Sequence, residues 1–191
     1  MKILREVVIT VLIAVAVFAC LRLTMQSYTV VMSSMEPNFE QGDCIMVSKV
    51  SYRSSQPQRG EVIVFDPPFY SPHPYIKRVI GLPGDIVEIK NGKVSINGTP
   101  LQEEYIMAPS DEPMPAIQVP DNQYFVLGDN RNSSNDSHNG WMVPRDNIIG
   151  KAWFVYWPPS KWGLVKHYSY PELLGTEEEG TALSQPLGGM S

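Results

Sequence analysis

The sequence has few of the side chains from which disulfide frameworks, metal sites and histidine-dependent active sites are built. It contains two cysteines and three histidines in 191 residues. Cys20 lies in an apolar segment and Cys44 in an expected strand, so we do not expect a bridge between them, and the ligands are too few for a metal site. The sequence therefore predicts neither a metal nor another cofactor.

Positive charge is also scarce. The 15 Lys and Arg residues are outnumbered by 20 Asp and Glu residues, which gives a formal net charge of -5. Proteins that bind nucleic acid usually present a basic face, and this composition offers none. We therefore expect no nucleic acid partner. The chain is long enough for one globular domain with appendages.

Long hydrophobic runs are absent except at the N-terminus. Val7 to Leu21 is apolar apart from Thr10, and the wider segment from Ile3 to Met25 adds charges only near its ends. As a helix the inner run measures about 22 Å, whereas the wider segment spans the roughly 30 Å hydrocarbon core if its arginines extend towards the interface. We expect residues 1–25 to form a cytoplasmic end and a transmembrane anchor.

Two alternatives for this segment are a cleaved signal peptide and a lipoprotein signal that ends at Ala19-Cys20. Phe18 fits a lipoprotein cleavage site poorly, and no clear small-x-small site follows the apolar run. An uncleaved anchor is therefore the favoured interpretation.

The charges that flank the segment predict its orientation. Lys2, Arg5 and the amino terminus outweigh Arg22. Because cytoplasmic flanks carry the excess of positive charge, the N-terminus is expected in the cytoplasm and the following domain on the far side of the membrane.

After the anchor, 17 prolines and 14 glycines in the whole chain leave little room for long helices, so we expect a mainly β fold. Asn91-Gly92 lies within an alternating segment and predicts a tight hairpin. We expect a compact β-barrel or sandwich-like domain over residues 26–170. Its expected strands are 44–50, 61–65, 86–96 with the hairpin inside it, 123–127 and 148–157.

Other segments are expected to lack regular pairing. Residues 26–28 form a short connector, and the proline-rich segments 66–74 and 107–120 are predicted loops. The polar segment 171–191 is predicted to be a disordered tail. The aromatic residues near the end of the domain are expected in the core, with the bilayer interface as the alternative for some of them: Trp153, Phe154, Tyr156, Trp157 and Trp162.

Three stretches carry residues that could perform chemistry together. Val30 to Asp43 contains Ser34 close to the membrane segment, Tyr75 to Asp85 contains Lys77, and a polar segment follows at 128–137. A serine hydroxyl is a poor nucleophile until a base removes its proton. No histidine stands in a setting typical of a triad, so Lys77 is the candidate base.

A lysine acts as a base only when it is neutral, and its ordinary pKa of about 10.4 keeps it charged at neutral pH. Burial among apolar neighbours lowers the pKa of a lysine. Neighbouring residues of a strand point to opposite faces, so Arg78 can pair with an acid such as Asp129 while Lys77 faces Ser34.

In their order and spacing these three stretches resemble type I signal peptidases, over the anchor and from Met32 to about Trp157. The resemblance implies a membrane-bound endopeptidase that removes N-terminal signal peptides from exported preproteins by cutting after small residues of the Ala-x-Ala type. It implies that Ser34 is the nucleophile and Lys77 the general base.

The resemblance also implies roles for the residues around this pair. Ser134 would hydrogen-bond to Lys77 and orient it, and Met35 would line the substrate cleft. The backbone N–H of Ser34 would stabilise the oxyanion of the tetrahedral intermediate. The residues expected to brace the site are Arg78, Asp129, Arg131 and Asp136.

Three positions depart from the family pattern. Met32 stands where many relatives have a serine that donates to the oxyanion, so Ser33 or a backbone group would have to replace it. Asn38 stands where threonine is more frequent. His138 stands where many members have arginine, which would make a charged brace pH-dependent.

The resemblance implies a single-pass protein of the plasma membrane, or alternatively of a thylakoid membrane, with secretory preproteins and the lipid bilayer as partners. Soluble self-cleaving repressors also pair a serine with a lysine, but this sequence has no helix-turn-helix pattern. The alternative from another functional class is a membrane-tethered β-domain binding module with a degenerate peptidase site, as Met32 and His138 would allow.

Overall fold

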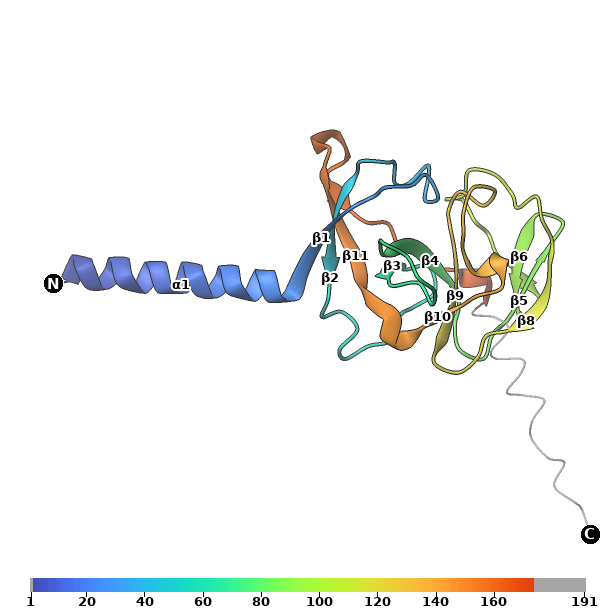
Figure 1. The fold of residues 1–191 in the computed structure, drawn as a ribbon, viewed down its shortest axis with the longest axis horizontal. Helices are drawn as coiled ribbons and strands as arrows, with labels where there is room; N and C mark the ends of the chain where they lie inside the picture. Colours follow the sequence, from blue (N-terminus) through green and yellow to red (C-terminus); the bar gives the residue numbers. More distant parts are fainter. Residues whose placement is uncertain (1, 174–191) are drawn as a thin grey trace, which may run out of the picture.

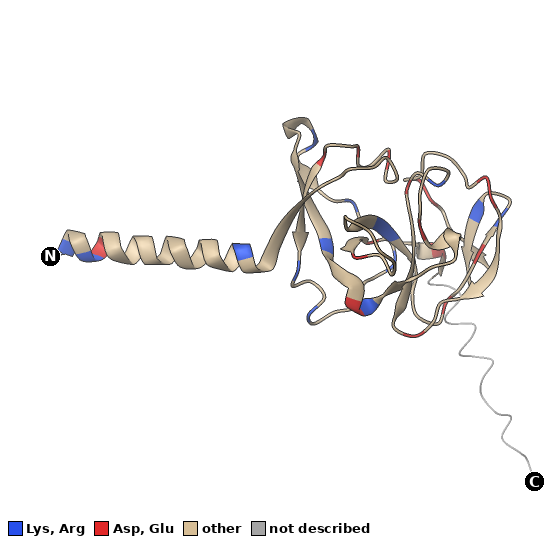
Figure 2. Ribbon diagram, in the orientation of Figure 1, with Lys and Arg blue, Asp and Glu red and all other residues tan. Residues whose placement is uncertain are grey.

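The computed structural model describes residues 2–173. One long helix, α1 (Lys2–Thr24), projects from a body of β-strands (Figure 1). The charged residues of α1 lie near its two ends, and its middle carries none (Figure 2). Its 23 residues give a length of about 34 Å. The helix is therefore long and apolar enough to cross a bilayer.

The strands form two antiparallel sheets within the described residues, which confirms the expected mainly β fold. The larger sheet follows the order β1-β2-β11-β3-β4-β9-β10, with β12 paired to β11. Its strands are β1 (Met25–Thr29), β2 (Cys44–Ser48), β3 (Val62–Phe65), β4 (Tyr75–Gly81), β9 (Gln123–Leu127), β10 (Val143–Pro144), β11 (Ile148–Trp157) and β12 (Gly163–Leu164).

The smaller sheet lies at the end of the body away from α1 (Figure 1). In the order β7-β6-β5-β8, it consists of β5 (Ile86–Lys90), β6 (Lys93–Ile96), β7 (Thr99–Pro100) and β8 (Met114–Gln118). Asn91 and Gly92 join β5 to β6 with φ values of 52° and 76°. Positive φ at both central residues is the requirement of a type I′ turn, so the hairpin prediction is confirmed.

Two predicted irregular segments are in fact strands. Residues 26–28 belong to β1, whose residues all pair with β2. Most of the side chains of this edge strand are polar, so no apolar alternation announced it. Within the predicted loop 107–120, β8 pairs with β5 although it contains Pro115. The register is irregular there and β8 is an edge strand, which is where a residue without an N–H is tolerated.

The core expectation for the tryptophans is wrong. Trp153, Trp157 and Trp162 are 50%, 55% and 66% exposed, respectively. The register of β11 against β2 shifts across Trp153 and again just before Trp157, so these irregular positions escape the inward-facing alternation. Phe154 and Tyr156 are half-buried.

The centre of the larger sheet is the most deeply buried part of the fold. Every residue of β3 is buried, because β3 lies between β11 and β4. Lys77 and Arg78 of β4 are among the largest fully buried side chains. The sheet therefore holds two cationic residues inside the core, where each needs a specific environment.

Over residues 2–173, four short 3-10 helices complete the fold: η1 (Ser137–Asn139), η2 (Arg145–Asn147), η3 (Pro159–Lys161) and η4 (Pro171–Leu173). The last of these lies at the start of the segment predicted as a tail, and its Leu173 packs against the core cluster that includes Tyr170. The rest of the predicted tail, residues 174–191, lies outside the described residues.

Candidate active site

Ser34 lies in a compact turn between β1 and β2. The Glu36 amide donates to the Ser33 carbonyl at 3.1 Å, and the Phe39 amide donates to the Met35 carbonyl at 2.9 Å. Met35 and Phe39 are buried in the core cluster beneath the turn. The apolar side chains thus anchor the turn and hold the Ser34 side chain, which is only 3% exposed, in one place.

Lys77 approaches this serine from the middle of β4. It pairs with Ile63 of β3, and none of its surface is exposed. Its Nζ atom lies 2.6 Å from Ser34 Oγ and 3.0 Å from the carbonyl oxygen of Ile76. The first distance is that of a hydrogen bond, so a neutral Lys77 amine is placed to accept the proton of the Ser34 hydroxyl.

Burial lowers the pKa of Lys77 from its ordinary value of 10.5 to about 8. Desolvation disfavours the charged ammonium, while the charges of Asp136 and Asp129 partly oppose it and raise the pKa. The net result is a lysine that is largely neutral in mildly alkaline solution, as a general base requires.

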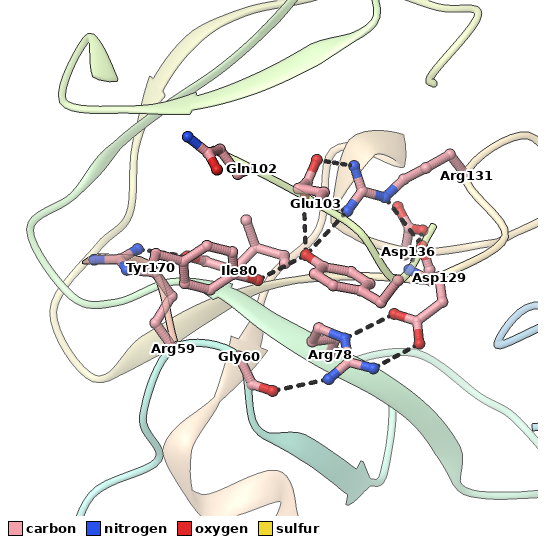
Figure 3. A network of polar contacts seen from close by, with 12 residues as sticks. Arg59, Gly60, Arg78, Ile80, Gln102, Glu103, Asp129, Arg131, Asp136 and Tyr170 are labelled. Carbon is pink, nitrogen blue, oxygen red and sulfur yellow. Dashed lines mark hydrogen bonds and ion pairs between the residues drawn. The ribbon is translucent and has the colours of Figure 1, made fainter. Parts of the chain in front are cut away.

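Arg78 points away from Lys77 and forms the predicted ion pair. Its Nε and Nη2 atoms donate to the two carboxylate oxygens of Asp129 at 2.8 and 2.7 Å (Figure 3). The guanidinium also donates to the Gly60 carbonyl at 2.9 Å and lies over the ring of Tyr105 at 4.3 Å. The cation is therefore compensated on every side, and Asp129 is held by a bidentate contact.

The third stretch comes close to the serine because residue 128 is glycine. A Cβ atom on Gly128 would lie 2.4 Å from the Ser34 carbonyl oxygen and 2.3 Å from Ser134 Oγ. Asn130 donates its amide to that Ser34 carbonyl at 3.0 Å. Asp136 accepts the Gly128 amide at 2.9 Å and caps η1. These bonds fix the loop against the nucleophile turn.

Ser134 is the one bracing residue whose predicted contact is not formed. Its hydroxyl is buried, yet within the described part of the chain it has no hydrogen-bond partner. It lies beside Gly128, close to the site, but does not reach Lys77. A buried hydroxyl without a partner is costly. The orienting role of Ser134 therefore stays a prediction, while the carbonyl of Ile76 contacts the lysine in this structure.

Arg131 is the centre of a second network of hydrogen bonds and ion pairs, which includes residues distant from it in the chain. It donates to the Gly128 carbonyl at 3.2 Å and forms a bidentate ion pair with Glu103 (Figure 3). The Tyr105 hydroxyl donates to Glu103 at 2.7 Å and lies 2.6 Å from the hydroxyl of Tyr170. This network links the loop of residues 128–137 to Tyr170, which directly precedes η4.

The contacts of two members of these networks are not predicted by the sequence pattern. Glu103 neutralises the buried Arg131, and Asn38 donates its side-chain amide to Asp129 Oδ2 at 2.9 Å and to the Tyr105 carbonyl at 2.8 Å. Glu103 lies outside the three motif stretches. Asn38 lies in the same stretch as Ser34, but its partner Asp129 is distant in the chain, so only an account of how each buried charge is paired could have found these contacts.

The backbone N–H of Ser34 is available to an oxyanion. Within residues 2–173 it donates no hydrogen bond. Ser33 uses its carbonyl to accept from Asn130 Nδ2 at 3.2 Å, and its hydroxyl makes no bond in the same part of the chain. Met32 is exposed and offers no donor. A second oxyanion donor from Ser33 stays a prediction.

An apolar cavity of about 300 Å³ leads to the two residues. It is lined by Ser34 and Lys77, by β1 and the residues after it, and by the start of β4. Met35 is fully buried in the core and is not among the lining residues, whereas the exposed Met32 is. The cavity matches the volume of small ligand pockets.

The three histidines differ in how well each is placed to act as the base of Ser34 instead of Lys77. His167 accepts the Val62 amide through Nδ1 at 3.3 Å, and burial lowers its pKa to about 4. His138 lies 3.9 Å from Glu112 and does not line the cavity of Ser34. Only His73 lines the cavity of Ser34. The described residues contain no cluster of three potential metal ligands.

A family model described as signal peptidase, peptidase S26, matches residues 3–157. The chain belongs to this signal peptidase family. It is 49% identical over 144 residues to a probable signal peptidase I-1 of Synechocystis, covering 72% of this chain and 74% of that protein. It is 32% identical over 191 residues to signal peptidase IB of Staphylococcus aureus, covering 90% and 97%.

A further relative of this chain is a chloroplast protein. The chain is 41% identical over 143 residues to a probable thylakoidal processing peptidase 2 of Arabidopsis thaliana, covering 71% of this chain and 39% of that protein. The family model and these relatives confirm the resemblance that the three motifs indicated.

The first prediction concerns the stability cost of Lys77 in this signal peptidase fold. Because its pKa is about 8 in the folded state and 10.5 in the unfolded state, the unfolded chain binds more protons between these values. The free energy of unfolding of the wild type should therefore rise relative to that of Lys77→Met, by roughly 3 kcal/mol, as the pH rises through this window. Urea unfolding of the detergent-solubilised proteins at several pH values measures the difference.

Comparing the two proteins cancels the titration of the buried tyrosines, which occurs in both. A difference that stays constant from pH 8 to pH 10.5 would contradict a depressed pKa of Lys77.

Proposed function

We propose that this protein is a membrane-bound serine endopeptidase that removes signal peptides from exported preproteins. The observation that carries the proposal is the 2.6 Å contact between Lys77 Nζ and Ser34 Oγ at the wall of an apolar cavity. Membership of the signal peptidase family supports the same activity.

The geometry supports a simple order of proton transfers. Neutral Lys77 takes the hydroxyl proton of Ser34 as Oγ attacks the scissile carbonyl carbon. The carbonyl oxygen becomes an oxyanion and accepts a hydrogen bond from the backbone N–H of Ser34. The Lys77 ammonium then returns the proton to the leaving amine as the C–N bond breaks. A water molecule, activated by the same amine, hydrolyses the acyl-enzyme and restores Ser34.

The bracing residues keep this pair in position and set its charge. Arg78 forms an ion pair with Asp129, so the negative charge of Asp129 near the Lys77 amine is compensated. An unpaired Asp129 would raise the pKa of Lys77 further and so favour the inactive ammonium. Asp129, Asp136, Arg78 and Arg131 are therefore assigned to positioning.

The cavity supports a preference for small side chains. Its volume is about 300 Å³ and most of its lining is apolar, including Val30, Ile45 and Val64. β1 is an edge strand that also lines the cavity, so an extended substrate can add alongside it as a further strand. Such pairing presents the peptide backbone to Ser34 and leaves selection to side-chain size, which fits substrates of the Ala-x-Ala type.

The length and apolar character of α1 support a single-pass placement in the membrane. The helix spans once, with Lys2 and Arg5 on the cytoplasmic side and the β body on the extracytoplasmic side. This matches a plasma membrane enzyme, and the thylakoidal relatives make a thylakoid membrane the alternative.

Precursor processing tests the activity. Purified protein in detergent should cut a secretory precursor after an Ala-x-Ala sequence, as read by mass spectrometry of both products. Ser34→Ala and Lys77→Ala should each lower kcat/KM by roughly three orders of magnitude or more, and the double variant should be little worse, because the two residues act as one unit.

His73→Ala is the sharpest control for this experiment, because His73 shares the cavity. It should keep kcat/KM within about a hundredfold of the wild type. If it silenced a well-folded enzyme, the base would be the imidazole. If the wild type and all variants left the precursor intact, the result would instead support the alternative of a membrane-tethered binding module.

The pH profile tests the protonation state of the base. Only free enzyme with neutral Lys77 can accept the Ser34 proton, so kcat/KM should rise about tenfold per pH unit below pH 8 and level off above the Lys77 pKa of about 8. A profile already level from pH 6.5 would exclude a lysine base with this pKa.

Membrane fractionation and protease accessibility test the topology. The full-length protein should stay in the pellet after alkaline carbonate extraction, because α1 spans the bilayer. Protease added outside right-side-out vesicles should degrade the β body. Recovery in the carbonate supernatant would contradict the anchor, and a protected body would reverse the orientation.

A further inference from the structure

A groove at the junction of α1 with the β body adjoins the cavity of Ser34, with which it shares Ser27 and no other lining residue. It has a volume of about 660 Å³. Its helix side consists of Phe18, Leu21, Arg22 and, just after the helix, Met25. The spacing i, i+3 and i+4 places Phe18, Leu21 and Arg22 on one face of α1, and Met25 opens β1 directly after the helix. This face of α1 therefore turns towards the body rather than away from it.

The opposite side of the groove comes from the larger sheet. Met46 of β2, Lys49 just after β2, and Trp153 of β11 line it. Lys49 is held close to the end of the helix, because its amide donates to the Thr24 carbonyl at 2.8 Å. Trp153 lies where the register of β11 shifts against β2, and it is 50% exposed.

The charges of the groove have one sign. Arg22 and Lys49 line it, and no lining residue is acidic. Among the described residues, neither cation forms an ion pair. The Arg22 guanidinium lies over the Phe18 ring at 5.4 Å, so the cation is held at the border between polar and apolar surface. The groove thus offers uncompensated positive charge directly above an apolar surface.

With α1 in the bilayer, as proposed above, the groove lies at the level of the lipid headgroups. Phe18 and Leu21 then lie beside acyl chains, while the arginine in the last helical turn lies at the interface. An exposed tryptophan is typical of the same layer. The molecule that offers an anion above an apolar chain at this depth is a phospholipid.

We propose that the junction groove binds an anionic phospholipid, with the phosphate between Arg22 and Lys49. One acyl chain lies along Phe18 and Leu21, and Trp153 covers the glycerol region. The bound lipid fills the space between helix and sheet and so fixes the angle at which the β body is held over the membrane. This role is independent of the peptidase chemistry.

Native mass spectrometry tests the proposal directly. The full-length protein in a non-ionic detergent is titrated with phosphatidylglycerol or with phosphatidylcholine of identical acyl chains. Each cation near the membrane surface strengthens binding of an anionic headgroup by about fivefold. Arg22→Gln/Lys49→Gln should therefore weaken phosphatidylglycerol binding by about 25-fold and leave phosphatidylcholine binding nearly unchanged.

A matched control removes the same charge elsewhere. Lys90 and Lys93 are exposed and paired across the β5–β6 hairpin, at the end of the body away from α1. Lys90→Gln/Lys93→Gln should keep the wild-type preference for phosphatidylglycerol. Equal binding of the two lipids to the wild type, or an equal loss in both double variants, would overturn the proposal.

Fluorescence locates the lipid without relying on the charge variants. Phosphatidylglycerol with brominated acyl chains should quench the tryptophan emission more than brominated phosphatidylcholine at the same concentration. Trp153→Phe should remove most of this difference, because Trp153 is the tryptophan that lines the groove. An unchanged difference in Trp153→Phe would place the lipid elsewhere and refute the site. No substrate is present in either experiment, so neither depends on peptidase activity.

Discussion

The burial of Lys77 is the constraint on which the rest of the site depends. A fully buried ammonium without an adjacent carboxylate is unfavourable, and burial therefore lowers the pKa of the lysine to about 8. The sheet can impose this because β4 lies between β3 and β9, and the apolar side chains of β3 are all buried beside it. The lowered pKa is thus a consequence of where in the sheet the lysine lies, and the folded state carries the free-energy cost of burying it.

Because side chains alternate between the two faces of a strand, the second buried cation of β4 has a different environment from Lys77. Arg78, the next residue, points to the other face and finds Asp129, which also accepts from Asn38. Asn38 belongs to the same turn as Ser34, so the carboxylate of Asp129 joins the strand of Lys77 to the turn of Ser34. Loss of Asp129 would therefore disturb three elements at once, whereas a surface ion pair would contribute little.

The sequence predicts the parts of this arrangement that depend on local pattern. Asn91-Gly92 determines a turn by its backbone requirements, and the alternation around Lys77 places base and brace on opposite faces. It does not reveal Glu103, whose role depends on a buried arginine distant in the chain, or β8, which tolerates Pro115 because it lies at an edge. Non-local pairing and edge position are properties of the assembled sheet, so no local pattern contains them.

Under the proposed function, the short path from α1 to Ser34 limits which peptide bonds can be cut. Nine residues lie between Thr24 and Ser34, and the ten steps from one to the other reach about 35 Å in a fully extended chain. β1 accounts for five of these residues and runs at an extended rise, about 17 Å in all. A substrate whose apolar segment stays in the bilayer beside α1 must therefore present its scissile bond within a comparable number of extended residues. In this proposal the enzyme selects substrates by the distance of the scissile bond from the membrane as well as by side-chain size. A lipid that fixes the angle of the β body would narrow the range of distances that are accepted.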